Sequence, residues 1–262
     1  MALIDPDLLL RAYAIGVFPM SDGRDAADVY WVEPRRRAIL PLDGFHLSRS
    51  LRRTLRSGRF TITRDRAFAE VIRRCSKRPE TWINTSIEES YLDLHARGSA
   101  HSIETWKDGK LVGGLYGVRL ATAFFGESMF SDATDASKVA LAWLVARLKV
   151  GGFGLLDCQF MTDHLKSLGA VEISQKRYLE LLAAELDAAA ALLSRRGDAL
   201  GRSAGAGPER AGPDRSGPDR SGPGRAGADF GALELVLAAA GVSPESAAPS
   251  GCVISQLLVQ TS

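Results

Sequence analysis

Two short motifs place two carboxylates and an amide where they could act together. Asp157 and Gln159 lie in the apolar run LLDCQF (155–160), and Glu127 lies in FFGESMFS (124–131). Because alternate residues of a β-strand share a face, Asp157 and Gln159 are predicted to project from the same side. Two acids brought close together cost free energy unless a cation or a shared proton compensates. The pattern predicts either a site for a cationic or proton-donating group, or structural pairs of satisfied polar side chains.

A cluster of basic residues precedes these motifs. Between Arg35 and Arg78 there are 14 Lys or Arg and only three Asp or Glu, whereas the whole chain has 33 basic and 31 acidic residues. Such clustering is typical of a surface that contacts a phosphate backbone, although a single cationic helix face can also be merely solvated. The candidate RNA-binding residues are Arg52, Arg53, Arg56 and Trp82, the last either as a platform for an unpaired base or as core filler.

The cysteines, the histidines and the lengths of the apolar runs exclude several classes of protein. Cys75, Cys158 and Cys252 lie far apart with no C-x-x-C pair, and the four histidines lack the spacing of metal ligands. The longest apolar run, 139–146, is far shorter than the roughly 20 residues that span a bilayer, and the N-terminus is acidic where a secretory leader is basic. We therefore expect a cytoplasmic protein without a metal or other cofactor.

Periodicity and turn signals predict the elements that position these residues. Four helices come first, the fourth capped by Ser86, and an antiparallel meander with an Asp108-Gly109 turn follows. A long helix separates the meander from the strand that carries Asp157. The predicted helices are 8–13, 47–56, 68–75, 87–97, 134–149, 163–168 and from 175 onward, and the predicted strands are 101–106, 110–118, 122–127, 153–160 and 171–173.

The composition changes abruptly near residue 198. Of the 27 residues from 201 to 227, twelve are Gly or Pro, so this segment cannot bury enough apolar surface to offset its ordering entropy. Beyond it, 230–240 is expected to form at most a short helix and 252–259 a short apolar segment. We predict a small N-terminal domain over 1–44, a catalytic domain over 45–196, and a linker and tail over 197–262 that is largely disordered.

The order of the predicted elements resembles the core of the N-acetyltransferase-like (GNAT) superfamily. This resemblance predicts an α+β fold: a GNAT-like catalytic domain with a small N-terminal domain and a disordered C-terminal tail. An acyl-CoA N-acyltransferase is one alternative, but the turn before the long helix carries Asp132 and Asp135, where that class binds pyrophosphate on backbone amides. A non-catalytic RNA-binding module is the other alternative, and it leaves the acidic cluster without a role.

Several longer motifs together resemble the leucyl/phenylalanyl-tRNA–protein transferase family. They run in order from about residue 8 to residue 186 and include YAIGVFPMSD (13–22), YWVEPRRRAILPL (30–42), TWIN (81–84), HARGSAHSIETW (95–106), FFGESMFS and LLDCQF. The resemblance implies an enzyme that moves Leu or Phe, with Met as a further candidate, from aminoacyl-tRNA to proteins with N-terminal Arg or Lys. It also implies that the product is marked for degradation, and that neither a metal nor acyl-CoA takes part.

The resemblance also implies roles for individual residues. Asp157 and Gln159 match the reaction centre, Glu127 with Asp157 matches the site for the acceptor's basic residue, and Trp82 matches an aromatic that holds the terminal adenosine. The residues that match the pocket for the transferred side chain are Leu115, Met129, Leu141, Leu144 and Leu156. An aminoacyl ester is already activated, so its aminolysis needs positioning more than a covalent intermediate. Asp157 can then be a base that accepts the proton directly or through Gln159, or only a positioning group with the terminal ribose hydroxyl of the tRNA assisting.

Overall fold

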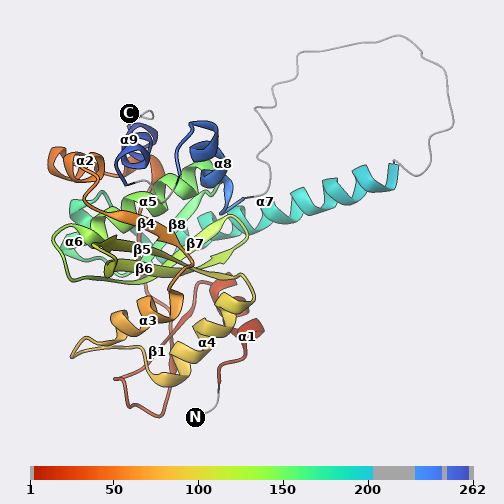
Figure 1. Cartoon of the computed structure of the whole chain (residues 1–262). Helices are drawn as coiled ribbons and strands as arrows, with labels where there is room; N and C mark the ends of the chain where they lie inside the picture. Colours follow the sequence, from red (N-terminus) through yellow and green to blue (C-terminus); the bar gives the residue numbers. More distant parts are fainter. Residues whose placement is uncertain (1–2, 203–227, 244–246, 260–262) are drawn as a thin grey trace, which may run out of the picture.

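A computed structural model describes residues 3–202, 228–243 and 247–259 of the chain (Figure 1). Its strands are β1 (Phe18–Met20), β2 (Tyr30–Val32), β3 (Arg36–Ile39), β4 (Thr61–Arg64), β5 (Ala100–Lys107), β6 (Lys110–Leu120), β7 (Ala123–Ser131), β8 (Leu155–Gln159) and β9 (Val171–Ser174). Its helices are α1 (Pro6–Ala14), α2 (Arg49–Arg56), α3 (Phe68–Ser76), α4 (Thr85–Ala96), α5 (Ala136–Val150), α6 (Asp163–Ser167), α7 (Gln175–Arg202), α8 (Ala232–Ala239) and α9 (Ala247–Leu257), with a 3-10 turn at Leu42–Gly44. The mixed α+β class predicted from the sequence is confirmed.

One sheet of seven strands organises the molecule. Its strand order is β4-β5-β6-β7-β8-β3-β9, and every neighbouring pair is antiparallel except β7 and β8. The two parallel strands are joined by α5, as parallel neighbours require a crossover. They pair only from Ala123 to Phe125 with Leu155 to Asp157, although β7 continues to Ser131. The sheet therefore opens between these strands beyond Phe125 and Asp157.

Helices cover both faces of the sheet and give the protein two apolar cores. On one face α2, α5, α8 and α9 pack over the sheet, and α5 is buried almost all round, which matches the apolar run 139–146 at its centre. On the other face lie α1, α3, α4 and the first turns of α7. Figure 1 shows α2, α5, α8 and α9 above the sheet and α3, α4 and α1 below it.

The main sheet takes in a strand that the sequence analysis assigned to the N-terminal domain. β3 lies between β8 and β9 and pairs antiparallel with both. The predicted boundary after residue 44 places residues 36–39 in the N-terminal domain, whereas in the structure they form a strand of the main sheet. The sequence does not reveal this strand, because β3 has only four residues and its partners, β8 and β9, are more than 100 residues away. Before β3, only β1 and β2 form a small separate sheet.

The cap of α4 is also two residues earlier than predicted. The side chain of Asn84, not Ser86, accepts the hydrogen bond of a first-turn amide, that of Ile87, at 2.9 Å. Asn84 is buried and its amide nitrogen also donates to the carbonyl of Ala26. Because this residue meets both the helix and a distant loop, it fixes the loop that carries Trp82 two positions before it.

The predicted disordered tail differs from the structure in two stretches. Residues 228–243 and 247–259 form α8 and α9 with their flanking turns, and Phe230, Leu233, Leu237 and Ile254 are buried in the same core as α5. Residues 197–202 continue α7. The remaining positions of the predicted tail, 203–227, 244–246 and 260–262, lie outside the described residues. Few apolar residues suffice for α8 and α9 because the rest of their core is supplied by α5 and α2.

Candidate active site

The opening between β7 and β8 leads into a cavity of about 460 Å³. Residues after the last paired position of each strand line it, namely Gly126 to Ser131 on β7 and Cys158 to Phe160 at the end of β8. Side chains from α5 and α6 and from the loop before α4 close the remaining walls, and most of the lining is apolar. The parting of two parallel strands thus makes a pocket that reaches from one helical layer toward the other.

Glu127 enters this cavity because β7 has a bulge at that position. Tyr116 of β6 pairs with Ser128 and Gly117 with Gly126, so Glu127 is an extra residue without a partner on β6. A bulge re-aims its side chain relative to regular alternation. Gly117 permits the bulge, since a Cβ there would lie 2.2 Å from the carbonyl oxygen of Phe125. The predicted third strand, 122–127, stopped at this irregularity, whereas β7 continues through it.

The Glu127 carboxylate is buried and held by two tyrosines. It is 7% exposed and accepts hydrogen bonds from the hydroxyls of Tyr13 on α1, at 2.7 Å, and Tyr91 on α4, at 3.0 Å. Burial raises the pKa of Glu127 to about 7, with a further rise from the charge of Asp157, and the hydrogen-bonding groups oppose this rise. Near neutral pH this carboxyl group is therefore poised between its charged and neutral forms.

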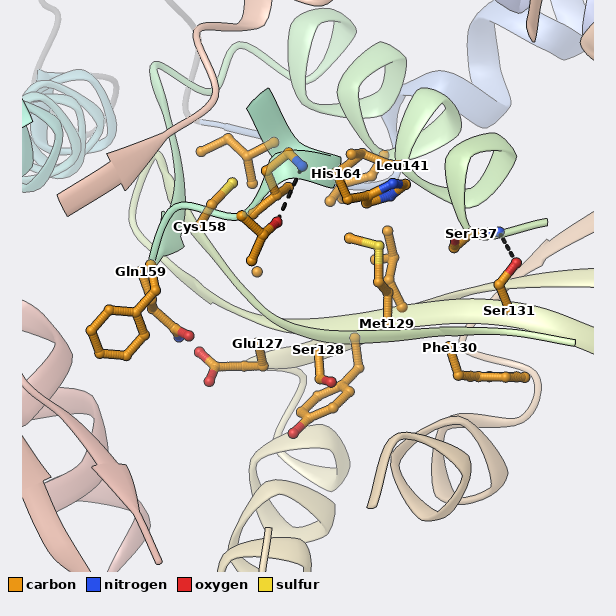
Figure 2. A pocket seen from close by; sticks show the side chains of 18 of the residues that line it. Glu127, Ser128, Met129, Phe130, Ser131, Ser137, Leu141, Cys158, Gln159 and His164 are labelled. Carbon is orange, nitrogen blue, oxygen red and sulfur yellow. Dashed lines mark hydrogen bonds between the residues drawn. The ribbon is translucent and has the colours of Figure 1, made fainter. Parts of the chain in front are cut away.

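Gln159 lies on the other side of Glu127. Its carboxamide points toward the Glu127 carboxyl group (Figure 2) and lowers the pKa of Glu127. The carboxamide nitrogen makes no hydrogen bond with any described residue. The backbone of Gln159 has a φ of 60°, in the left-handed region that non-glycine residues rarely adopt. This turn ends β8 and directs the amide into the cavity. A buried amide nitrogen without a partner is a donor available to a ligand.

Asp157 lies beneath this site, fully buried, in an ion pair with Arg37. The guanidinium donates to both carboxylate oxygens, with Nε to Oδ1 at 2.9 Å and Nη2 to Oδ2 at 2.5 Å. Tyr178 donates its hydroxyl to Oδ2, and the backbone N–H of Gln159 donates to Oδ1 at 2.8 Å. Asp157 is not among the residues that line the cavity. In this geometry its side chain holds the backbone of Gln159 in place from beneath the cavity.

Arg37 is itself enclosed on all sides. Its guanidinium lies over the rings of Phe18, at 4.6 Å, and Tyr178, at 4.5 Å, and donates to the carbonyl oxygen of Gly16. Aromatic faces and a carbonyl stabilise a buried cation by the same electrostatics that favour its carboxylate partner. The pair therefore ties β3, β8, α7 and the turn after α1 together directly under the site.

The other wall of the cavity is apolar. All five residues that the resemblance assigned to a side-chain pocket line it, and so does Trp82. These five are Leu115, Met129, Leu141, Leu144 and Leu156. In Figure 2 the side chain of Met129 rises toward Leu141 and His164, away from the Glu127 and Gln159 side. The cavity thus joins one ionisable end to one apolar end.

The structure adds site residues that the sequence analysis did not single out. Tyr13 and Tyr91 hold Glu127, Arg37 holds Asp157, and the half-exposed Phe160 and His164 line the cavity. The Nε2 atom of His164 is buried without a hydrogen-bond partner among the described residues, and burial with the nearby Lys138 ammonium lowers its pKa. Tyr13 and Arg37 lie in motifs that carried the resemblance, but their contacts join positions over 100 residues apart.

The basic helix forms a second surface on the α5 side of the sheet. Arg49, Arg52, Arg53 and Arg56 of α2 surround a shallow hollow together with Ser57. None of these four arginines makes an ion pair with an acid in the described part of the chain. The inner face of α2 is formed by Leu51 and Leu55, as the helical spacing predicts. The hollow is therefore lined by four positive charges that lie close together.

The described residues contain no group of three or more His, Cys, Asp or Glu side chains that could hold a metal ion. Among the helices formed by the same residues, none has the length and apolar character needed to cross a bilayer.

The fold and the cavity define an α+β protein whose cavity has a buried carboxyl group at one end and an apolar wall at the other. Comparison with known proteins identifies the family. Residues 39–183 match the family described as leucyl/phenylalanyl-tRNA protein transferase, and residues 3–35 match the N-terminal domain of that family. The chain belongs to the leucyl/phenylalanyl-tRNA protein transferase family.

Individual relatives agree with this assignment. The chain is 59% identical over 266 residues, the whole of both chains, to a leucyl/phenylalanyl-tRNA–protein transferase of Rhizorhabdus wittichii. It is 62% identical over 184 residues, 69% of each chain, to that of Zymomonas mobilis. Among solved structures, FemX is a distant likeness, with 13% identity and a TM-score of 0.44 over 64% of this chain and 66% of that chain.

The buried ion pair generates a test of stability with a neighbouring control. We expect Arg37→Met to lower the free energy of unfolding by about 3–5 kcal/mol, because Asp157 is left charged and buried without its cation. Arg36→Met removes an exposed arginine from the same strand, paired with Glu172 at the surface, and is expected to cost less than about 1 kcal/mol. Urea unfolding of both variants measures the difference. Equal losses would mean that the buried pair is not the stronger constraint.

The pKa of Glu127 generates a test with pH. The ordinary value of 4.5 in the unfolded chain rises to about 7 in the folded protein, so the stability contributed by this group is fully present below pH 4.5 and is lost as pH rises through 7. We therefore expect Glu127→Gln to gain stability relative to the wild type between about pH 5 and pH 8, by up to about 3 kcal/mol. Urea unfolding at several pH values measures this gain, with the surface variant Glu172→Gln as control. Parallel stability curves would contradict the raised pKa.

Proposed function

We propose that this protein transfers Leu or Phe from aminoacyl-tRNA to the α-amine of proteins that begin with Arg or Lys. Membership of the transferase family supports the reaction, and one observation carries the assignment of the site: a single cavity joins the buried Glu127 carboxyl group to a wall of five Leu and Met side chains. The product would carry a Leu or Phe N-terminus that signals degradation. Cytoplasmic location and a GNAT-like catalytic domain are further parts of this proposal.

Glu127 would receive the basic side chain of the acceptor. A guanidinium or ammonium group beside it favours the charged carboxylate and forms charge-assisted hydrogen bonds. An acceptor that begins with Ala offers no such cation and leaves the ionised carboxylate buried without compensation. The selectivity for Arg or Lys would therefore come from the cost of an unpaired charge as well as from the contact itself.

Gln159 would position the acceptor's α-amine against the ester. The amine nitrogen attacks the ester carbonyl carbon, a C–N bond forms, the ester C–O bond breaks, and its electron pair returns to the terminal ribose oxygen. The amine loses a proton and the ribose oxygen gains one. The carboxamide oxygen of Gln159 is a suitable acceptor for the attacking N–H, and its free nitrogen is a suitable donor to the ester. Asp157, held by Arg37, would act through Gln159 as a positioning group.

The apolar wall would select the transferred residue. Leu and Met side chains adapt to the shape of a ligand, and a cavity of about 460 Å³ leaves room for side chains of the size of Leu, Phe or Met. Trp82, at the edge of the same cavity, is available to stack on the terminal adenosine. The acidic turn before α5, where Asp135 is the N-cap residue, remains unfavourable for the pyrophosphate of a CoA ligand.

The arginines of α2 would bind the phosphate backbone of the tRNA. Arg49, Arg52, Arg53 and Arg56 form the unpaired basic hollow, and neutralising phosphates there releases condensed counterions. This contribution is independent of sequence and decreases steeply with salt. It fits a partner that is recognised mainly as an RNA, with the aminoacyl group recognised separately in the cavity.

Transfer to a peptide tests the reaction and the role of Gln159 together. Purified protein with labelled Leu-tRNA should modify an Arg-initiated peptide but not an Ala-initiated peptide. Gln159→Ala should lower kcat by about 100-fold or more and leave the Kd for aminoacyl-tRNA within about twofold, because it removes positioning and not the RNA surface. Gln175→Ala, at a surface glutamine of α7 that bonds Glu33, is the matched control. Equal loss of binding and turnover in Gln159→Ala would show a structural role instead.

Charge reversal on α2 tests the RNA surface. We expect Arg52→Glu, Arg53→Glu and Arg56→Glu together to weaken aminoacyl-tRNA binding at least about 10-fold and to reduce the salt slope of log K by about two to three. The control variant replaces Arg11, Lys176 and Arg177 with Glu. These substitutions change the net charge equally, but they lie on α1 and α7, across the sheet from α2. Binding titrations at several salt concentrations measure both variants. Similar effects in both would show that only net charge matters.

A further inference from the structure

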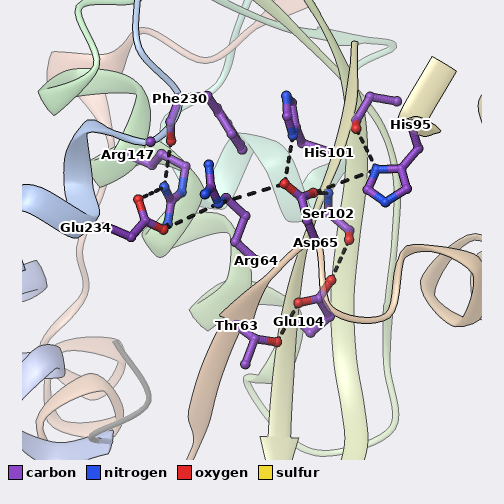
Figure 3. Close-up of polar contacts among 12 residues, drawn as sticks. Thr63, Arg64, Asp65, His95, His101, Ser102, Glu104, Arg147, Phe230 and Glu234 are labelled. Carbon is purple, nitrogen blue, oxygen red and sulfur yellow. Dashed lines mark hydrogen bonds and ion pairs between the residues drawn. The ribbon is translucent and has the colours of Figure 1, made fainter. Parts of the chain in front are cut away.

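The C-terminal segment, residues 228–243 and 247–259, is built into the catalytic domain through the ring of Phe230. This ring is 2% exposed and stacks on His101, at 4.3 Å, and on Phe124, at 5.4 Å between centroids. The guanidinium groups of Arg64 and Arg147 lie over it at 5.8 and 5.1 Å (Figure 3). One aromatic residue of the segment therefore contacts β4, β5, β7 and α5 at once.

The segment also supplies the counter-charge of a buried arginine. Arg147 of α5 is 2% exposed and donates to both carboxylate oxygens of Glu234, at 2.6 and 2.7 Å, and to the carbonyl oxygen of Phe230. Arg64 of β4 reaches the same carboxylate at 3.4 Å. Without Glu234, Arg147 would be a buried cation without a carboxylate, which is strongly unfavourable. Since α5 is the crossover helix of the active-site cavity, the segment is coupled to the catalytic core.

A second contact joins the segment to the arginine helix. α9 approaches α2 so closely that a Cβ added to Gly251 would lie 1.8 Å from the carbonyl oxygen of Leu55. Ile254 and Leu258 of the segment are buried in the same core as Leu51 and Leu55. α2 has only eight residues, too few to be stable as an isolated helix, so its stability depends on the surfaces that cover its inner face. Those surfaces are α5 and α9.

The charges of the segment are unfavourable for direct contact with phosphate. Its described residues include two acids, Asp229 and Glu234, and no Lys or Arg. Its most exposed large apolar residue is Leu235, which is 70% exposed on α8. An effect of the segment on the binding of a polyanion is therefore expected to come from the position that it imposes on its neighbours.

We propose that the C-terminal segment is a positioning element for aminoacyl-tRNA: it clamps α2 against α5 so that the four arginines of α2 present a fixed phosphate-binding surface. The proposal rests on the RNA role of α2 given above. The helix and its arginines gain affinity by preorganisation, because less conformational entropy is lost when the tRNA binds. The chemistry in the cavity, between β7 and β8, does not use this contact.

Gly251→Val in the full chain tests the clamp, because the new side chain cannot fit against the backbone of α2. We expect the amides of α2 to exchange hydrogen at least about 10-fold faster while those of β5 to β7 keep their protection. The KM for aminoacyl-tRNA should rise about fivefold or more, with a smaller salt slope, and kcat at saturating aminoacyl-tRNA should stay within about twofold. Gly23→Val is the matched control, since a Cβ at Gly23 meets no atom within 4 Å.

Further variants separate the possible outcomes. Leu235→Ala should leave the KM for aminoacyl-tRNA unchanged. A raised KM in this variant would overturn the proposal by showing that the segment contacts the tRNA directly. If Gly251→Val does not fold, Ile254→Ala removes buried contacts more mildly and should change α2 exchange and KM in the same direction. Unchanged α2 exchange, or a fall in kcat at constant KM, overturns the proposal. If α2 exchange rises without a change in KM, the clamp fails as a device for RNA binding, and the charge-reversal variant then shows whether α2 binds RNA at all.

Discussion

The ion pair between Arg37 and Asp157 is the constraint on which the rest of the site depends. It is fully buried, so its stability requires every remaining polar atom to be satisfied, and Tyr178, the Gly16 carbonyl and the Gln159 amide do this. Each of these partners comes from a different part of the chain. The pair therefore fixes the relative positions of α1, β3, β8 and α7, and the end of β8 turns into the cavity only because Asp157 accepts the Gln159 N–H.

Glu127 and Asp157 are both buried acids on neighbouring strands, yet their surroundings give them different chemistry. Asp157 has a permanent cation against it, whereas Glu127 accepts hydrogen bonds from two neutral tyrosine hydroxyls and lies beside the carboxamide of Gln159. Burial then raises the pKa of Glu127 to about 7. A buried carboxylate without a structural counter-ion is stabilised most by a ligand that carries a positive charge. No basic side chain among the described residues is hydrogen-bonded to Glu127, and this supports the proposal that a cationic ligand binds there.

Much of this arrangement could be predicted from the sequence, and the exceptions have physical reasons. The helices α1 to α5 and the hairpin of β5 and β6 follow from periodicity and from Asp108-Gly109, which are local signals. The bulge at Glu127 is not local, because it is defined only by the pairing of β7 with β6. The same holds for β3, whose four residues become a strand through β8 and β9. The five residues that the resemblance assigned to a side-chain pocket all line one cavity, but the pairing that buries Asp157 required the structure.

The C-terminal segment shows why composition alone misjudges the end of a chain. A run rich in Gly and Pro precedes α8 and α9, and neither helix has enough apolar residues for a core of its own. Phe230 and Glu234 nevertheless complete a core and an ion pair whose other halves, Phe124 and Arg147, lie in the catalytic domain. Arg147 follows the apolar run 139–146 of α5, and its burial there requires an acid from a distant part of the chain. The transferase domain is therefore incomplete without the residues that follow the Gly- and Pro-rich run, and its arginine helix lies at the junction between the two.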